Sequence, residues 1–146
     1  MLKVLLILIL LFPLSGFLTL GIGFRSIPKR LASIIGPGTV LLSFLLSIYL
    51  FISFYHFTIL PSYHLFTWIH AGPLTIPFDL LLDPLSMLML LVVTGVGFII
   101  HVYSVGYMKG DPGFNRFFSY MNLFIFSMLL LVLGANYPIM FIGWEG

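Results

Sequence analysis

Four long apolar runs constrain this chain more than any other feature. They cover about residues 4–24, 38–60, 84–108 and 116–134. A helix needs about 20 mainly apolar residues to cross the hydrocarbon core of a bilayer. Only 7% of the residues are charged and the mean hydropathy is +1.21, whereas soluble domains carry roughly 25% charged residues. We therefore predict an all-α membrane protein, a polytopic bundle of transmembrane helices.

A fifth apolar segment, residues 137–146, begins after Asn136 and stops with the sequence at Gly146. Asn136 is a good helix N-cap, so the pattern predicts four complete spans plus the first half of a fifth. We expect residues 1–146 to form a single transmembrane unit. Because the sequence stops inside a predicted span, we expect a fragment or a split-gene product.

The first run also resembles a secretory signal peptide, because Lys3 supplies a charged start. We favour a transmembrane span, since the run is long and no A-x-A cleavage pattern follows it. Asp83-Pro84 predicts the start of the third span, with an acidic N-cap and proline in the first turn.

Between the second and third spans, residues 61–79 read as an interfacial loop rich in proline and amphipathic aromatic residues. A short hairpin of Leu65–Ile69 and Leu74–Leu80 is compatible with this loop, with Pro77 restricted to an edge position.

The basic residues predict the orientation of the chain. All but Lys3 fall in the first and third loops: Arg25, Lys29, Arg30, Lys109 and Arg116. Lysine and arginine in short loops are retained on the cytoplasmic or matrix side. The N-terminus is therefore expected on the periplasmic or intermembrane-space side.

Glu145 is the leading candidate for a functional residue. It lies nine residues beyond Asn136, which at about 1.5 Å per residue is roughly 13 Å into the membrane. An ionisable side chain at that depth is costly, so it is a candidate proton carrier. If the helix starts later, Glu145 is instead a solvated residue near the interface.

His101 is the second candidate, on a small and polar helix face with Thr94, Gly97 and Ser104. Such a face can line a hydrated proton path with histidine as a relay, or form a seam where helices pack closely. Packing is the favoured interpretation from the residues alone. The face formed by Asn115, Ser119 and Asn122 has the same two interpretations.

Several other classes of function are excluded or unsupported. There is no basic run of the kind that binds nucleic acid, and there is no cysteine. The spacing of His56, His64 and His70 does not match a metal-binding pair on one helix face, so no metal site is predicted. No phosphate-binding loop or hydrolase motif is present.

Residues 83–146 contain the elements HVYSVGYM, RFFSYMNLF and GWEG. This stretch closely resembles subunit L, or chain 5, the antiporter-like subunit of respiratory complex I. Residues 1–82 match it more loosely.

The resemblance implies the N-terminal piece of a proton-translocating subunit in the membrane arm of NADH:quinone oxidoreductase. Its partners would be the other membrane-arm subunits, the lipid bilayer and transported protons. NADH, FMN, Fe–S clusters and quinone would belong to other subunits, and no cofactor is expected in this chain. The resemblance assigns a proton-coupling role to Glu145, paired with a lysine on a later helix, and a less settled role to His101.

Two other functions remain open from the sequence. One is the large subunit of a multisubunit cation/proton antiporter or of a membrane-bound hydrogenase. The other is a structural piece that does not pump. The expected location is the bacterial inner membrane, with the mitochondrial inner membrane as the alternative.

Overall fold

The computed structural model describes residues 2–54 and 62–146. The five helices and two strands are α1 (Leu2–Ile22), α2 (Lys29–Phe54), β1 (Tyr63–Ala71), β2 (Leu74–Leu80), α3 (Pro84–Tyr107), α4 (Phe114–Leu133) and α5 (Tyr137–Glu145). The first four helices are long and apolar enough to cross a membrane. The predicted fold class is confirmed, with a small two-stranded sheet added to the helices.

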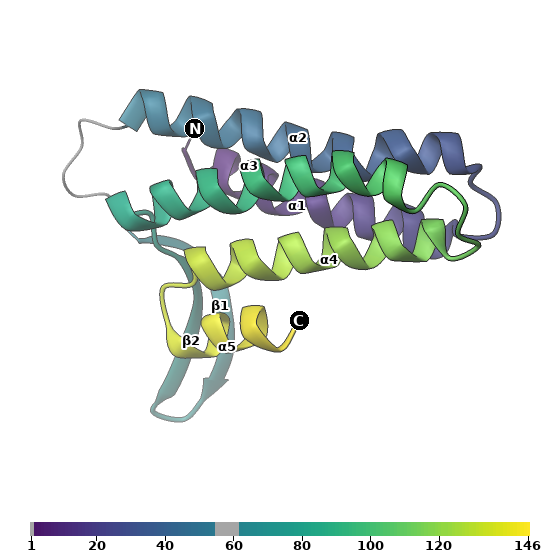
Figure 1. Ribbon diagram of the computed structural model, residues 1–146. Helices are drawn as coiled ribbons and strands as arrows, with labels where there is room; N and C mark the ends of the chain where they lie inside the picture. Colours follow the sequence, from purple (N-terminus) through teal and green to yellow (C-terminus); the bar gives the residue numbers. More distant parts are fainter. Residues whose placement is uncertain (1, 55–61) are drawn as a thin grey trace.

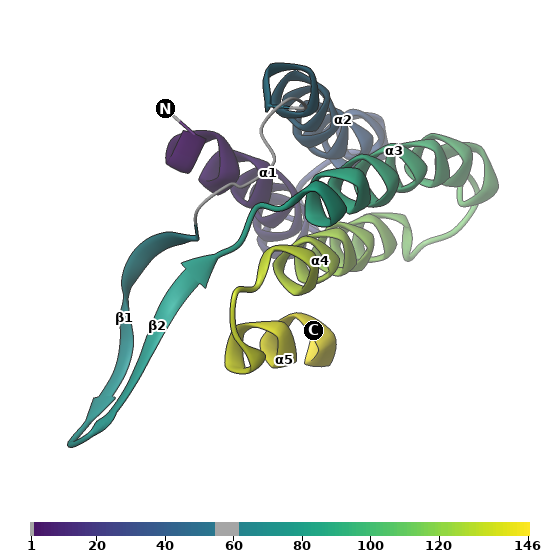
Figure 2. The same cartoon turned by 90° about the vertical axis from the view of Figure 1, so that its left-hand side faces the viewer.

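Helices α1 to α4 lie side by side as a bundle (Figure 1). Seen nearly end-on, α1 packs against α2 and α4, and α3 packs against the same two helices from the other side (Figure 2). Helix α5 packs on α4, away from α3. Helix α4 is therefore the element that separates α5 from the interior of the bundle.

The outer surface of the bundle is apolar. Large apolar side chains are strongly exposed on every long helix, including Val4, Ile34, Ile99 and Phe124. In water such a surface would be an aggregation liability, but against lipid tails it costs nothing. The exposed residues therefore agree with a bundle that faces lipid.

Helix α2 begins nearer the N-terminus than the sequence predicted. It starts at Lys29 and continues through Pro37, whereas the expected start was residue 38. Pro37 removes one backbone donor, but neighbouring helices can satisfy a proline-containing helix in a membrane. The carbonyl of Gly36 accepts a hydrogen bond from Asn122 Nδ2 on α4 at 3.4 Å. This tertiary contact holds α2 against α4 next to the proline.

The other predicted boundaries of the long helices differ from the structure by about two residues. Helix α1 ends at Ile22, and α4 starts at Phe114. Residues 55–60, the predicted end of the second span, lie outside the described residues, as does His56.

Both predicted helix caps are confirmed. Asp83 Oδ1 accepts from the backbone N–H of Ser86 at 2.7 Å, and Ser86 Oγ accepts from the backbone N–H of Asp83 at 2.9 Å. This reciprocal arrangement is a capping box. At α5, Asn136 Oδ1 accepts from the backbone N–H of Ile139 at 3.1 Å. Each cap satisfies donors that would otherwise be unpaired at the start of a membrane helix.

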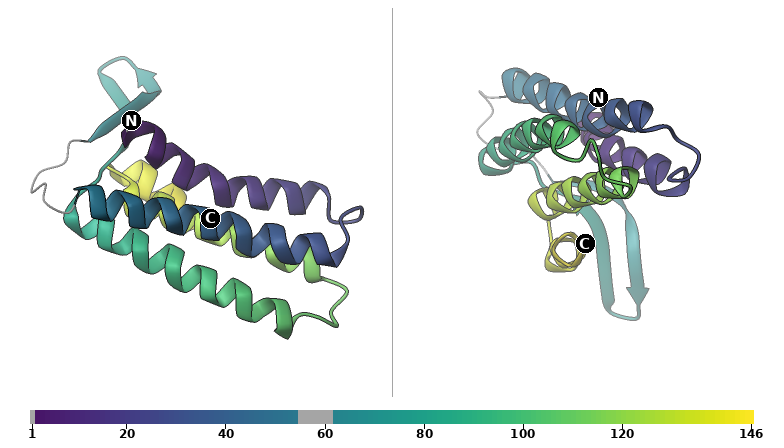
Figure 3. Two further views of the ribbon diagram at one scale, coloured as in Figure 1. Left: turned by 90° about the horizontal axis from the view of Figure 1, so that it is seen from above. Right: turned by 45° about the vertical axis from the view of Figure 1, so that its right-hand side comes forward.

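The hairpin anticipated between the second and third spans is present. Strands β1 and β2 pair antiparallel, and Gly72 in the turn has a φ of 59°, which suits glycine. Strand β1 is longer than the predicted Leu65–Ile69 segment. The hairpin extends sideways from one end of the bundle, at the same end as the N-terminus (Figure 3).

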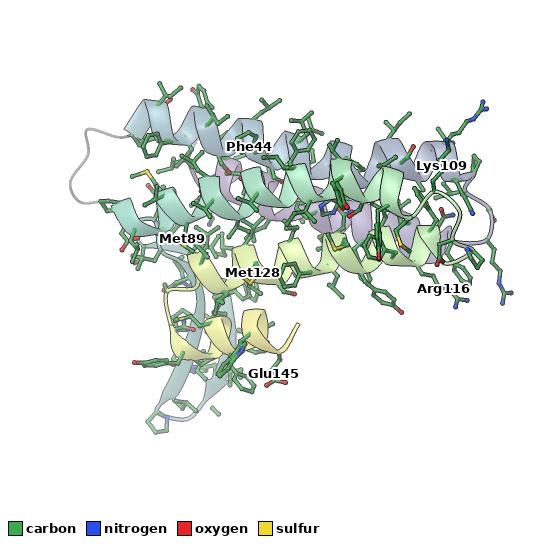
Figure 4. The ribbon with its side chains drawn as sticks, in the orientation of Figure 1. Phe44, Met89, Lys109, Arg116, Met128 and Glu145 are labelled. Carbon is green, nitrogen blue, oxygen red and sulfur yellow. The ribbon has the colours of Figure 1, made fainter. Side chains whose placement is uncertain are left out.

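Hydrogen bonds fasten the base of the hairpin to the connection between α4 and α5. The backbone N–H of Ala135 donates to the carbonyl of Asp79 at 3.1 Å. Asn136 Nδ2 donates to the carbonyl of Pro77 at 2.8 Å. Lys109 and Arg116 lie at the opposite end of the bundle (Figure 4). The basic loops and the hairpin therefore occupy opposite ends of the molecule.

Candidate functional site

The interior of the bundle contains polar side chains from several helices. Buried polar residues come from all three of α2, α3 and α4: Ser43, Ser47, Ser86, Thr94, His101, Ser104, Asn115, Ser119, Asn122 and Ser127. Polar groups inside a membrane are costly unless they are hydrogen-bonded. We therefore ask which hydrogen-bond partner each polar group has. A group whose donors and acceptors are all paired serves packing, whereas an unpaired donor or acceptor is free for another role.

His101 is fully buried in the bundle, with an exposed fraction of 0%. Its Nδ1 atom lies 2.7 Å from the carbonyl oxygen of Gly97, one turn earlier in α3. Its ring lies 6.0 Å from the ring of Phe118 on α4, measured between centroids. The other ring nitrogen, Nε2, is buried and has no hydrogen-bond partner among the described residues.

The Gly97 contact determines the tautomer of a neutral His101. A carbonyl oxygen can only accept, so His101 Nδ1 must carry the hydrogen and donate it. Nε2 of the neutral ring is then an unprotonated acceptor with no donor among residues 2–54 and 62–146. A buried nitrogen of this kind can receive a proton from a water molecule or from a group on another element.

The face of α3 that carries His101 points into the bundle. Thr94 and Ser104 are buried on it, and Thr94 Oγ1 donates to the carbonyl of Leu90 at 2.5 Å. A Cβ added at Gly97 would lie 2.5 Å from Ile125 Cδ1 on α4. Gly97 therefore permits close approach of the two helices, which supports a packing role for part of this face.

The polar face of α4 is used mainly for packing against α1 and α2. Ser119 Oγ donates to the carbonyl of Phe17 at 3.0 Å. Asn115 Nδ2 donates to the carbonyls of Phe24 and Ile27 at 3.1 and 2.7 Å. Of the two interpretations of this face, the structure supports the packing seam. Asn115 Oδ1 is an exception, because it is buried without a donor among the described residues.

Three residues of α2 complete the polar interior and were not singled out from the sequence. Thr39, Ser43 and Ser47 recur at a spacing of four, the signal that would have placed them on one helix face. Ser43 Oγ donates to the carbonyl of Ile9 on α1 at 2.8 Å. Ser47 Oγ donates to the carbonyl of Ser43, also at 2.8 Å. The Ser43 hydroxyl therefore joins α2 to α1, whereas the Ser47 hydroxyl bonds within α2.

Glu145 is the last residue of α5, and its side chain is exposed. It points away from α4 (Figure 4). A Cβ added at Gly146 would overlap Ser127 Oγ, so the end of α5 is level with Ser127 on α4. Ser127 lies roughly 9 Å along α4 from the end of that helix, at 1.5 Å per residue. The carboxyl group is thus beside an apolar span and not at the end of the bundle.

The structure does not bring the two candidate residues together. His101 lies inside the bundle, whereas Glu145 is exposed on α5, on the far side of α4 (Figures 2 and 4). A proton passing between them would therefore need additional groups or water molecules.

The histidines of the hairpin have local partners. His64 Nδ1 lies 2.7 Å from Asp79 Oδ1 across the two strands, and His70 Nδ1 lies 3.0 Å from Thr75 Oγ1. Among residues 2–54 and 62–146, no three histidine, cysteine or acidic residues are grouped as metal ligands.

Comparison with known proteins identifies close similarity to one group of membrane subunits. The family profile described as "NADH-Ubiquinone oxidoreductase (complex I), chain 5 N-terminus" matches residues 68–118. NADH-quinone oxidoreductase subunit L of Escherichia coli is 43% identical over 94% of this chain, and that of Pseudomonas aeruginosa is 46% identical over 93%. NADH-ubiquinone oxidoreductase chain 5 of Allomyces macrogynus is 39% identical over 94%. The chain spans 22% to 23% of the length of these relatives.

Proposed function

We propose that this chain, which is related to the N-terminal part of the complex I subunit L and chain 5 family, contributes to proton translocation coupled to quinone reduction. The proposal places it in the membrane arm of an NADH:quinone oxidoreductase, beside other membrane subunits. Its location would be the inner membrane of a bacterium or of a mitochondrion, since relatives from both are similar. The resemblance of residues 83–146 to this family, noted from the sequence, is confirmed.

One observation in the bundle carries the proposal beyond family resemblance. His101 is a fully buried ionisable group with one ring nitrogen unpaired among the described residues. An unpaired buried polar atom costs about 1–3 kcal/mol, so the unpaired Nε2 favours a role for His101 beyond packing. We infer that His101 exchanges a proton or a hydrogen bond with water inside the bundle.

Glu145 would act as a second proton-carrying group. Its side chain is exposed, and among the described residues α5 packs mainly on α4, with a smaller contact to β2. In the whole protein, further helices against that exposed face would bury the carboxyl group. They would also supply the basic partner that a buried carboxylate requires.

The decisive experiment substitutes Glu145 by glutamine in the complete membrane complex. Glu145→Gln keeps the size and most hydrogen bonds of the side chain but removes the charge. We expect the complex to assemble, while proton pumping and the coupled quinone-reductase rate both fall. Pumping is measured as acidification of inverted vesicles, with quinone reduction followed in parallel. Normal pumping in an assembled Glu145→Gln complex would exclude Glu145 as a proton carrier.

Asp111→Asn is the matched control. It is the same acid-to-amide change, in an exposed loop at the other end of the bundle. Asparagine retains the oxygen that accepts from the backbone N–H of Gly113. Asp111→Asn should therefore leave pumping unchanged. An equal loss of proton pumping in both variants would show that the effect comes from altered folding or net charge.

A further inference from the structure

Two arginines at the basic end of the bundle share one aromatic ring. The Cζ atoms of Arg25 and Arg116 lie 5.2 and 4.6 Å from the centroid of Phe24. The two guanidinium groups are therefore less than about 10 Å apart, close to the screening length of about 8 Å at physiological salt. Their charges repel each other unless an anion lies between them.

In the part of the chain that the structure describes, no carboxylate supplies that anion. The one ion pair within 4.0 Å among the described residues joins His64 to Asp79 at the opposite end of the molecule. Asp111, in the loop just before the helix that carries Arg116, uses its Oδ1 atom to accept from the backbone N–H of Gly113. Both guanidinium groups are thus available to an external ligand.

A cavity of about 430 Å³ lies beside the two arginines, and we call it the arginine pocket. It is lined by Phe24, Arg25, Pro112, Gly113, Asn115 and Arg116. Its volume falls within the range of about 300–1,000 Å³ that is typical of ligand sites. The pocket is formed where the loop after α1 meets the start of α4, at the end of the bundle that carries Lys109 (Figure 4).

Asn115 indicates what kind of ligand the pocket would hold. Its Nδ2 atom donates to the carbonyls of Phe24 and Ile27, which fixes the orientation of the amide. Oδ1 is then an acceptor that is buried and has no donor among the described residues. The exposed fraction of Asn115 is 8%. A ligand that carries a hydrogen-bond donor as well as a negative charge would therefore complement both the arginines and Asn115.

A second cavity, of about 410 Å³, continues from the arginine pocket towards the membrane. It lies between α1 and α4 and is lined by Phe17, Gly21, Phe24, Arg116, Ser119 and Tyr120. Phe24 and Arg116 line both cavities. This second cavity could hold the start of an acyl chain, which a soluble phosphate ester does not have.

We propose that the arginine pocket binds a phosphatidylglycerol-type lipid, with its phosphodiester on Arg25 and Arg116 and a headgroup hydroxyl donating to Asn115 Oδ1. Arginine suits phosphate because its planar group can donate two parallel hydrogen bonds. A neutral hydroxyl is a better donor here than the ammonium of phosphatidylethanolamine, which both arginines would repel. Phosphatidylcholine has no headgroup donor. This site is distinct from the proposed proton-carrying residues and does not depend on them.

The test uses the natural protein that carries this chain, purified in its native complex and placed in nanodiscs of defined lipid. Native mass spectrometry counts the lipid retained when the discs contain phosphatidylcholine with a minor fraction of phosphatidylglycerol. We expect one phosphatidylglycerol to be retained per arginine pocket above the level of Arg25→Gln/Arg116→Gln. Losing charge-assisted hydrogen bonds should weaken retention at least about tenfold.

Arg30→Gln is the matched control, because Arg30 lies at the same end of the bundle but does not line the arginine pocket. The Arg30→Gln complex should still retain phosphatidylglycerol. Equal loss in Arg30→Gln and in the double variant would overturn the proposal in favour of diffuse attraction to a basic surface.

Unmodified protein provides a test that does not depend on the variants folding. Phosphatidylglycerol should be retained in preference to phosphatidylethanolamine, and soluble glycerol 3-phosphate should not displace it. Equal retention of the two lipids would refute the assigned role of the headgroup hydroxyl. Displacement by glycerol 3-phosphate would show a site for soluble phosphate esters and would refute the lipid proposal.

Discussion

Thr39 on α2 and Asn122 on α4 are joined by a hydrogen bond of 2.7 Å, with Thr39 Oγ1 as the donor and Asn122 Oδ1 as the acceptor. Gly16 on α1 lies against both. A Cβ added at Gly16 would lie 2.5 Å from each of these two oxygen atoms. Three helices of the bundle therefore meet at one polar contact, which requires a residue without a side chain on the third.

A double-mutant cycle on Thr39→Val and Asn122→Ala should reveal this contact. Hydrogen bonds between membrane helices contribute about 0.6 kcal/mol on average and up to about 1.7 kcal/mol. We expect a coupling free energy within that range, measured from unfolding of the purified protein in mixed micelles. Ser15→Ala is the control, because the Ser15 hydroxyl bonds only within α1. Strict additivity of the two substitutions would show that the hydrogen bond does not contribute.

Gly143→Ala should weaken the packing of α5 on α4. A Cβ at that position would overlap the backbone of Leu131, which cannot move as a flexible side chain could. Overpacking of this kind costs about 1–3 kcal/mol. The measurement is the rate at which a protease cleaves the connection between α4 and α5. Weaker packing of α5 should make this cleavage faster.

Gly38→Ala provides the comparison for that substitution. A Cβ at Gly38 would meet no atom within 4 Å, so the change should be neutral or slightly stabilising through helix propensity. If Gly143→Ala is tolerated as well as Gly38→Ala, the close contact between α4 and α5 does not exist in the folded protein.

The cap of α3 should make stability depend on pH. The hydrogen bond from the Ser86 hydroxyl, followed by that from the Ser86 backbone N–H, holds the pKa of the Asp83 carboxyl group below its usual value. A carboxyl group whose pKa is lowered on folding stabilises the protein above its unfolded pKa, and this is lost as the pH falls through the folded value. Ser86→Ala should cost about 1 kcal/mol near neutral pH. The difference in free energy of unfolding between Ser86→Ala and wild type should become smaller below about pH 4.

Asp83→Asn separates titration from capping in that experiment. Asparagine caps helices about as well as aspartate but does not titrate, so the acid-dependent part of the stability curve should disappear. Thermal unfolding at several pH values measures both variants. An Asp83→Asn protein that keeps the full acid dependence of wild type would assign the effect to another group.

Reporter fusions should establish the orientation in the membrane. Reporters placed after Arg30 and after Lys109 are expected on the cytoplasmic or matrix side, and one placed at Gly72 on the other side. In the structure, Arg30 and Lys109 line one cavity, and Lys109 lies at the end of the bundle opposite the hairpin (Figures 3 and 4). The reverse pattern of reporter activity would refute the predicted topology.

The sequence predicted the elements whose causes are local. Length and apolarity were sufficient for the four spans, and the caps at Asp83 and Asn136 depend only on nearby residues. The predicted start of the second span at residue 38 was wrong, because α2 begins at Lys29 and continues through Pro37, beside a hydrogen bond from Asn122 to the carbonyl of Gly36. No periodicity in α2 alone reveals that contact.

For the candidate site, too, local features could be predicted from the sequence and features that depend on other helices could not. Burial of His101 followed from its helix face, whereas the unpaired state of Nε2 depends on which side chains the other helices place nearby. The exposure of Glu145 could not be predicted either, because it depends on what packs against α5. Its role as a proton carrier stays a prediction, as does that of His101.

Asn136 gives both polar atoms of its side chain to different elements. Its oxygen starts α5 by accepting from Ile139, and its nitrogen holds β2 through the carbonyl of Pro77. A force that displaces the hairpin sideways must therefore break one of these bonds or tilt α5 with it. A protein or membrane surface bound to the hairpin could in this way change the angle at which α5, and the carboxyl group at its end, enters the bilayer.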